Sequence, residues 1–340
     1  MVTMRRKHYP WRTQTDEASR DLALVMTTVR VSPAVAAALR DGRPVVALES
    51  SVFAQGLPQP QNREAARRML AAVRARGAEP AITAVARGTP VVGLEGDDLE
   101  RFLARDGVRK ISARDIAPAA AARVDGATTV AGSLALAHAA HIAVLATGGI
   151  GGVHRVAPIS SHAFDAVRDE SADLAELART PMLVVCAGAK TILDLPATME
   201  RLESLGVAVV GYRVDELPGF LTSGTGISLS WRFESAAQVA AAWCMHRALG
   251  RTQAMVVVQA PPSPLPRGMV DDAVNRALDA AARAGIAGPA LTPWLLARLE
   301  EETGGSSLAT NVELLESNAA LASEIAAEVT GDVEIGRARA

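Results

Sequence analysis

Lysine is rare in this chain, and one lysine directly follows an apolar run. Of the 35 Lys and Arg residues, only Lys7, Lys110 and Lys190 are lysine, so lysine is expected where a compact amine or a point charge is needed. Lys190 closes the string Met182-Leu-Val-Val-Cys-Ala-Gly-Ala-Lys190. A neutral amine can attack a carbonyl or an anomeric carbon, which makes Lys190 a candidate nucleophile.

The elements around Lys190 place it where α/β proteins bind ligands. The Val-rich run before it is typical of a buried parallel strand, and the apolar spacing from Leu193 to Gly206 predicts a helix after it. Ligands of open α/β sheets bind at the carboxyl ends of strands. The partial positive charge of a helix N-terminus nearby favours the neutral amine over the ammonium.

Two further strings carry groups suited to chemistry. Pro44-Val-Val-Ala-Leu-Glu49-Ser-Ser-Val-Phe53 predicts a buried strand that carries a carboxylate, which is costly unless the carboxylate is paired or functional. Ala146-Thr-Gly-Gly-Ile-Gly-Gly-Val-His-Arg155 follows another apolar run, and its glycines let the backbone approach a ligand and present N–H groups to an anion. This glycine loop (residues 146–155) matches neither the dinucleotide-binding pattern nor a P-loop.

A carboxylate-rich segment precedes a predicted helix. It contains Asp165, Asp169 and Asp173. Two interpretations are open: Ser171 and Asp173 cap the helix N-terminus, or the segment holds a hard cation.

Composition excludes several classes of protein. The 340 residues are 49% hydrophobic with a net charge of −2, so we expect a globular protein and no nucleic-acid binding by phosphate neutralisation. The most apolar stretch, Ala127 to Leu145, contains His138 and His141 and changes period, which indicates two buried elements rather than a membrane span. No signal peptide is recognisable, so we expect a cytoplasmic protein.

The alternation of strand and helix patterns predicts an α/β fold. We expect one α/β/α sandwich with a largely parallel central sheet over residues 31–330. Residues 1–30 are polar without hydrophobic periodicity and predict a disordered extension, and residues 331–340 a tail.

Six strings together carry a family resemblance, which runs from about Ser32 to Glu328. They are Glu49-Ser, Pro58-x-Pro60-Gln-Asn62, Ala127-Thr-Thr-Val-Ala131, the glycine loop, Ser171-Ala-Asp-Leu174 and Val184-Val-Cys-Ala-Gly-Ala-Lys190. The chain resembles the pseudouridine-5′-phosphate glycosidases. The resemblance implies reversible cleavage of pseudouridine 5′-phosphate to uracil and ribose 5-phosphate, a homotrimer, and a divalent cation, usually Mn²⁺.

The resemblance also implies residue roles. Glu49 matches the proton donor, Lys190 the Schiff-base nucleophile and Asp169 the metal ligand, for which Asp165 competes. The implied substrate contacts are Lys110, Val130, Ser171, Ala172 and Asp173. A carbon–carbon glycosidic bond suits such a site, because an imine on lysine supplies the electron sink that two carboxylates cannot.

Two positions depart from the family pattern, and two alternative functions stay open. Gln55 replaces an expected histidine and Gln259-Ala260 an expected Asn-Pro pair, which bears on substrate preference. Another Schiff-base sugar-phosphate lyase or aldolase would share Lys190 without needing the glycine loop and Glu49 together. A non-catalytic sugar-phosphate sensor would tolerate the loss of Lys190.

Overall fold

Short runs rich in Val and Ala form the strands of one sheet. The computed structural model describes residues 28–155, 169–286 and 291–338, and its sheet has 11 strands. The strands are β1 (Arg30–Val31), β2 (Val45–Glu49), β3 (Glu79–Ala86), β4 (Thr89–Val92), β5 (Arg109–Ile111), β6 (Gly126–Thr128), β7 (Val144–Ala146), β8 (Leu183–Cys186), β9 (Ala208–Tyr212), β10 (Arg232–Phe233) and β11 (Met255–Val258). The central strands β2, β7, β8 and β11 are buried throughout, as expected for strands covered on both faces.

The helices begin at capping residues that the sequence displays. Ser32 precedes Pro33 and accepts a hydrogen bond from the Val35 N–H (3.4 Å), and Asp194 accepts one from the Ala197 N–H (3.0 Å). The helices are α2 (Pro33–Arg40), α3 (Gln61–Ala75), α4 (Gly96–Ala104), α5 (Ile116–Ala121), α6 (Val130–Ala139), α7 (Ala172–Leu177), α8 (Leu195–Ser204), α9 (Ala236–Ala248), α10 (Arg267–Arg283), α11 (Leu291–Glu302) and α12 (Ser306–Ala338).

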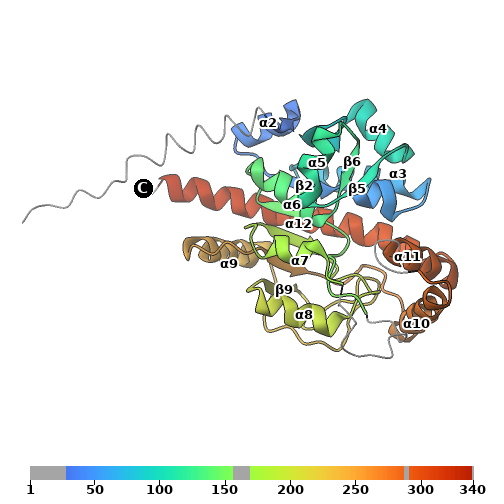
Figure 1. Ribbon diagram of the computed structural model, residues 1–340. Helices are drawn as coiled ribbons and strands as arrows, with labels where there is room; N and C mark the ends of the chain where they lie inside the picture. Colours follow the sequence, from blue (N-terminus) through green and yellow to red (C-terminus); the bar gives the residue numbers. More distant parts are fainter. Residues whose placement is uncertain (1–27, 156–168, 287–290, 339–340) are drawn as a thin grey trace, which may run out of the picture.

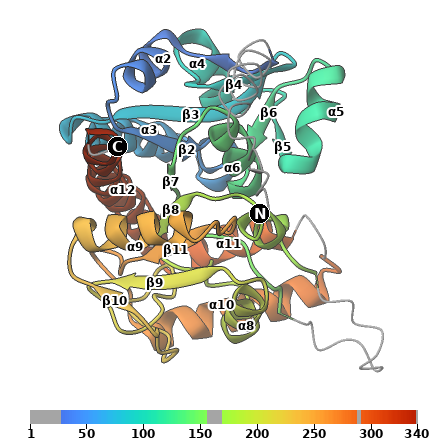
Figure 2. The same cartoon turned by 90° about the vertical axis from the view of Figure 1, so that its left-hand side faces the viewer.

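The sheet is largely parallel and lies between two layers of helices. Its strand order is β1-β4-β3-β2-β7-β8-β11-β9-β10, with β6 paired to β3 and β5. Among the described strands, the antiparallel pairs are β3 with β4 and β3 with β6. Helix α12 packs against α3, α9 and the strands β2, β7 and β8, whereas α6 packs on β2, β3 and β7 from the other side (Figures 1 and 2). The predicted α/β/α architecture is confirmed.

One edge of β3 is shared by two strands that run in opposite directions. β2 pairs parallel with β3 as far as Thr83, and β6 continues antiparallel at Ala84 and Val85. The carboxyl ends of β2 and β6 therefore meet head to head. Buried hydroxyls fill the junction, where Ser50 Oγ accepts from the Thr128 N–H (2.9 Å) and Thr128 Oγ1 donates to the Thr83 carbonyl (2.8 Å).

Some predicted boundaries differ from the structure. The strand that begins near Pro44 ends at Glu49 rather than Phe53, and a π-helical turn over residues 52–56 follows it. Asn62 does not cap α3; it lies inside the helix, and its amide donates to the carbonyls of Phe53 and Leu103 (both 2.9 Å). Most of the predicted extension 1–30 lies outside the described residues, but Arg30 pairs with β4 as part of β1.

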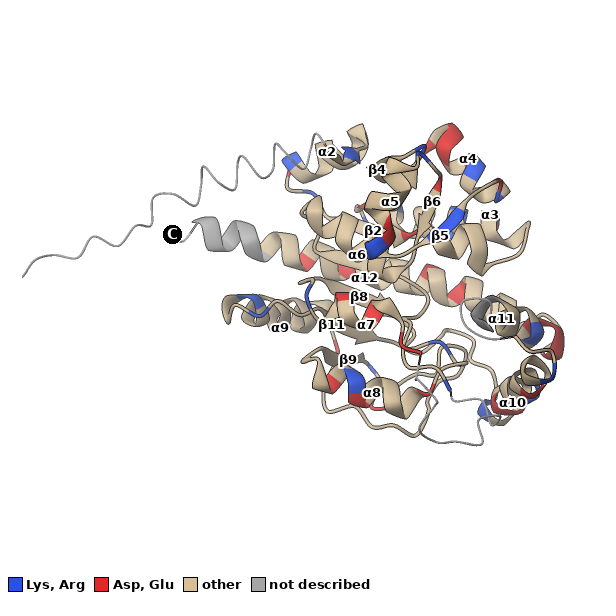
Figure 3. Ribbon diagram, viewed as in Figure 1, with Lys and Arg blue, Asp and Glu red and all other residues tan. Residues whose placement is uncertain are grey.

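Charged residues of both signs are interspersed on the outer helices, for example on α10 and α11 (Figure 3). Within the ranges that the structure describes, no helix is both long enough and apolar enough to cross a bilayer.

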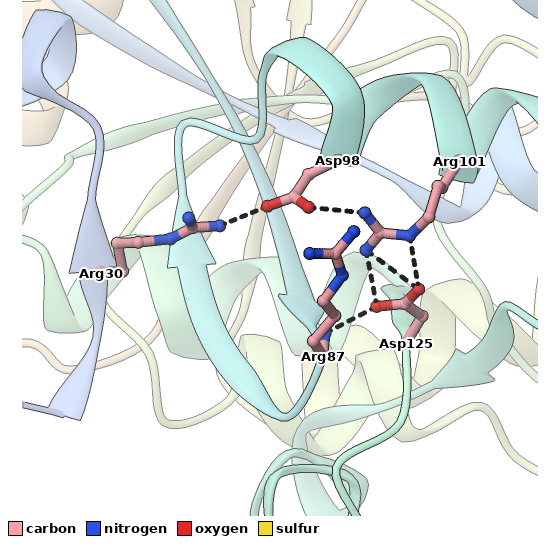
Figure 4. Close-up of polar contacts among 5 residues, drawn as sticks. All are labelled: Arg30, Arg87, Asp98, Arg101 and Asp125. Carbon is pink, nitrogen blue, oxygen red and sulfur yellow. Dashed lines mark hydrogen bonds and ion pairs between the residues drawn. The ribbon is translucent and has the colours of Figure 1, made fainter.

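An ion network ties β1 and α4 to the chain entering β6 (Figure 4). Asp98 accepts hydrogen bonds from Arg30 (2.6 Å) and Arg101 (2.6 Å), and Arg101 also contacts Asp125 (3.1 Å). Asp125 in turn accepts from the Arg87 N–H (2.6 Å). Hydrogen bonding by Arg30, followed by that of Arg101, lowers the pKa of Asp98 against the opposing effect of burial.

We predict that Asp98→Asn lowers the free energy of unfolding by about 1 kcal/mol at pH 7, because two charge-assisted hydrogen bonds are weakened. A carboxyl group whose pKa is lowered by folding stabilises the protein at pH values above its pKa in the unfolded chain, which is about 3.9. This contribution is lost as the pH falls through the pKa of the group in the folded protein. Urea unfolding should therefore show a difference from the wild type at pH 7 that shrinks below about pH 4.

Asp41→Asn is the control, since Asp41 is exposed and its ion pair with Arg43 is long at 3.8 Å. A loss for Asp98→Asn that is equal at both pH values would show that charge is not its cause.

Candidate active site

Three ionisable residues from distant parts of the sequence line one cavity. Glu49 ends β2, Lys110 lies within β5, and Lys190 follows β8 in the turn that leads to α8. They meet because the carboxyl ends of β2 and β8 lie at one edge of the sheet, while β5 pairs parallel with β6 and approaches that edge from the opposite direction. The other lining residues are Ser51, Val52, Gln55, Gly56, Leu57, Thr147, Gly148, Gly149, Phe220, Asn311 and Leu315.

Glu49 is held by two hydroxyl groups. Its side chain is buried, with 2% of the residue exposed. Ser51 Oγ donates to one carboxylate oxygen, and Thr147 Oγ1 donates to the other at 2.6 Å. Burial of this carboxyl group is thus compensated by hydrogen bonds on both oxygens, as a buried polar group requires.

Lys110 shares its electrostatic environment with the other two ionisable groups. Although the residue as a whole is exposed, protein atoms around the ammonium partly desolvate it and lower the pKa of Lys110. The positive charge of Lys190 lowers this pKa further, and the negative charges of Glu49 and Asp173 oppose the shift. Two amines and one carboxylate therefore interact across a single cavity.

The turn that carries Lys190 is bonded to the glycine loop. The Lys190 N–H donates to the Ile150 carbonyl (3.1 Å), and the Ile150 N–H donates to the Gly188 carbonyl (3.1 Å). Arg155 donates from its guanidinium to the carbonyls of Leu193 (3.1 Å) and Thr191 (3.2 Å). Gly188 has φ +92°, and a Cβ there would overlap the Pro218 carbonyl oxygen. This turn therefore requires glycine two residues before the amine.

The four glycines of the glycine loop serve two purposes. Gly148 and Gly149 line the cavity, as expected for close approach to a ligand, and a Cβ on Gly149 would also overlap Phe220. A Cβ on Gly151 would overlap Ser171, and one on Gly152 would overlap Thr198. The second pair of glycines is therefore needed for packing between loops, which the sequence interpretation did not anticipate.

Ser171 and Asp173 organise this packing. Ser171 is the N-cap of α7 and accepts from the Asp173 N–H (3.2 Å), so the capping interpretation fits Ser171. The buried Asp173 carboxylate accepts from the N–H groups of Ala131 (2.9 Å) and Gly151 (2.8 Å). It joins the N-terminus of α6 to the glycine loop.

The remaining predicted substrate contacts lie at this junction. Val130 is the first residue of α6 and Ala172 the first of α7. Together with Ser171 and Asp173, they are not among the residues that line the cavity. Their contact with substrate stays a prediction.

The N-terminus of α6 has an unused hydroxyl. Thr129 is the N-cap, yet among the described residues its buried Oγ1 has no hydrogen-bond partner. An N-cap side chain usually accepts from the N2 or N3 amide, but here Asp173 takes the Ala131 N–H at N2. A helix N-terminus with a free hydroxyl close to Lys110 is suited to binding an anion.

Asp169, the predicted metal ligand, is exposed and lies beside the glycine loop. Its carbonyl accepts from the His154 N–H (2.9 Å), and the Ser171 N–H donates to the Gly152 carbonyl (3.0 Å). Asp165 lies outside the described residues. No group of three His, Cys, Asp or Glu side chains in the described part of the chain could hold a metal. A hard cation can be held by one or two carboxylates and water, so a single carboxylate fits such a site only in part.

The structure adds residues that the sequence interpretation missed. Thr147 contacts Glu49, and Phe220 and Asn311 line the cavity. Thr147 stands inside the glycine loop and was therefore visible as part of a motif, whereas Phe220 and Asn311 join the site only through tertiary structure. Cys186, four residues before Lys190, is fully buried; burial raises its pKa to about 12, so it remains a thiol.

Known proteins are similar to this chain over nearly its whole length. A family model described as "Indigoidine synthase A like protein" matches residues 34–328. A pseudouridine-5′-phosphate glycosidase of Gemmatimonas aurantiaca is 58% identical over 299 residues, covering 87% of this chain and 95% of that protein. One from Herpetosiphon aurantiacus is 49% identical, covering 88% and 98%.

Two solved structures are also similar. The prealnumycin C-glycosynthase AlnA, in complex with ribulose 5-phosphate, has a TM-score of 0.81 and 37% identity over 90% of this chain and 98% of that chain. An indigoidine synthase A (IdgA)-like protein of Thermotoga maritima has a TM-score of 0.78 and 32% identity over 89% and 96%. With this identity and coverage, the chain belongs to the indigoidine synthase A-like family, whose relatives here are pseudouridine-5′-phosphate glycosidases.

Proposed function

We propose that this chain is a pseudouridine-5′-phosphate glycosidase that works through a lysine Schiff base. The observation that carries the proposal is the meeting of Glu49, Lys110 and Lys190 in one cavity beside the glycine loop. The relatives with this name are up to 58% identical, and the neighbouring C-glycosynthase is in complex with a pentose phosphate. A carboxyl group, an amine and a sugar-phosphate pocket are what the cleavage of a C-glycosidic bond requires.

The residues divide the reaction between them. Glu49 gives a proton to the ring oxygen of the ribose as the C1′–O bond opens, and the Lys190 amine bonds to C1′. The nitrogen lone pair then expels uracil, whose C5 takes up a proton, and C1′ is left as an imine. Water hydrolyses the imine to ribose 5-phosphate and free Lys190. The balance is pseudouridine 5′-phosphate plus water to uracil plus ribose 5-phosphate.

Glu49 and Lys190, the two groups that make and break bonds, can each be tested directly. Borohydride with ribose 5-phosphate should add one reduced sugar phosphate to the Lys190 peptide, as measured by mass spectrometry. Lys190→Arg should abolish both the label and uracil release, since a guanidinium stays protonated. Glu49→Gln should keep the fold and slow uracil release by roughly 10²–10⁴-fold, because an amide supplies no proton.

Lys110→Arg serves as the control for charge alone, because it keeps a cation in the cavity and leaves Lys190 in place. An aldolase would be labelled at Lys190 but would release no uracil from pseudouridine 5′-phosphate. A non-catalytic sensor would show no label, and its binding of the sugar phosphate would be unchanged in Lys190→Arg and in Glu49→Gln. Uracil release at the wild-type rate by Lys190→Arg would refute the mechanism.

We infer that the N-terminus of α6 binds the substrate phosphate. Thr129 contributes a hydroxyl with no partner in the described structure, the Val130 N–H lies at the first helical position, and Lys110 adds positive charge. Backbone N–H groups and the helix dipole favour an anion here. This assignment gives Val130 a backbone role, which agrees with its implied substrate contact and its buried side chain.

Thr129→Val should therefore raise KM for phosphorylated substrates by about tenfold, equivalent to one hydrogen bond to a charged group. The turnover number should change little, and Thr129→Ser should restore KM. Steady-state kinetics would measure both values. Pseudouridine without its phosphate is the control substrate, and an equal effect on both substrates would contradict a phosphate contact.

We propose further that Asp169 helps to hold a divalent cation, for which Mn²⁺ is the first choice. Carboxylate and water oxygens suit this ion, which when bound supplies positive charge beside the anionic substrate. Asp169→Ala should weaken Mn²⁺ binding in titration calorimetry by at least tenfold and more than Asp165→Ala does. The reverse order would move the ligand to Asp165, and full activity after exhaustive chelation would remove the metal from the reaction. The homotrimer and the cytoplasmic location stay predictions.

A further inference from the structure

The hydroxyl of Thr147 contacts Glu49 from a backbone position that is fixed on both sides. The Thr147 N–H donates to the Val185 carbonyl in β8 (3.0 Å), and its carbonyl accepts from the Asn318 side-chain amide (2.8 Å). Its Oγ1 donates to the Glu49 carboxylate (2.6 Å). With the backbone N–H and C=O both engaged, the backbone of Thr147 is held in place beside Glu49, and the hydroxyl donates to the carboxylate from that fixed position.

Asn318 is itself oriented by a third residue. It is fully buried in α12, and its NH₂ group faces the carbonyls of Thr147 (2.8 Å) and Gly148 (3.4 Å). Its Oδ1 accepts from the side-chain Nε2 of Gln259 (2.9 Å), the residue that follows β11. Carbonyl oxygens can only accept, so the NH₂ must face the glycine loop and the oxygen must face Gln259. The amide is thus fully used and has one stable orientation.

The C-terminal helix contributes to the cavity along one face. Asn311 and Leu315 line the cavity, and Asn318 supports its floor. These positions are spaced i, i+4 and i+7, so they lie on the same side of α12. None of the contacts between α12 and the glycine loop was expected from the sequence.

We propose that Thr147 is a positioning residue for the proton donor Glu49, and that Asn318 and Gln259 fix it from α12 and the end of β11. The inference rests on the proposed role of Glu49. Thr147 holds one carboxylate oxygen, so that the other, beside Ser51, keeps a constant direction towards the substrate. Gln259 stands where the family pattern has asparagine, and it acts on the site through Asn318 without lining the cavity.

The test uses variants that change the hydroxyl and little else. Thr147→Val keeps the branched shape and removes the hydroxyl, whereas Thr147→Ser keeps the hydroxyl. Each is measured in the wild-type background and in Glu49→Gln, by uracil release from pseudouridine 5′-phosphate. Circular dichroism and thermal unfolding confirm that each variant is folded.

We expect Thr147→Val to lower kcat by about 10- to 100-fold, the size of effect caused by a misplaced catalytic group, with KM within about twofold. Thr147→Ser should recover most of kcat. In the Glu49→Gln background, Thr147→Val should cost nothing further, because residues that act as a unit are not additive. A merely structural role would lower activity by the same factor in both backgrounds, and this result would overturn the proposal.

Gln259→Leu tests the outer link without replacing Asn318, because it removes the donor to Asn318 Oδ1. It should lower kcat several-fold in the wild type and have no effect in Thr147→Val. If Gln259→Leu still lowered kcat in the Thr147→Val background, Gln259 would not act through Thr147. Normal turnover by Thr147→Val with a slow Glu49→Gln would refute this inference alone, whereas normal turnover by Glu49→Gln would refute the proposed role of Glu49.

Discussion

The buried carboxylate of Asp173 is the constraint on which the arrangement of the site depends. A charge removed from water must be compensated, and here two backbone N–H groups compensate it, one from the N-terminus of α6 and one from the glycine loop. The same contact closes the space next to Gly151, where a Cβ would overlap Ser171 and Asp173. The N-terminus of α6, where we propose that the phosphate binds, and the loop that carries Thr147 are thereby held at a fixed separation. Loss of this carboxylate would leave two buried donors without partners, which is more costly than the loss of one bond.

Several parts of this arrangement could be predicted from sequence. Lys190 and Glu49 each end a short apolar run, and that local pattern is sufficient to place them at the carboxyl edge of a parallel sheet. The α/β/α architecture follows from the alternation of segments with the apolar pattern of a strand and segments with that of a helix. Helix starts such as Ser32 follow from capping chemistry. These are local properties of the chain, determined within one or two turns or strands.

The rest depends on contacts between distant segments. Asn318 reaches the Thr147 carbonyl across 171 positions, and no local pattern in a helix marks a buried asparagine as part of an active site. Similarly, Lys110 enters the cavity because β6 continues the edge of β3 where β2 ends, which is a matter of strand pairing. The four glycines look alike in sequence, yet only Gly148 and Gly149 line the cavity, whereas Gly151 and Gly152 lie against neighbouring side chains outside it.

The two lysines of the cavity have different parts in the proposed reaction. Two ammonium groups in one cavity disfavour each other, and the pKa of Lys110 is lowered by its surroundings and by Lys190. A substrate phosphate bound beside Lys110 opposes that shift, because an anion favours the charged amine. In the proposed reaction, the phosphate thus favours the protonated form of Lys110, and this cation holds the anionic end of the sugar while Lys190 supplies the amine that bonds to C1′.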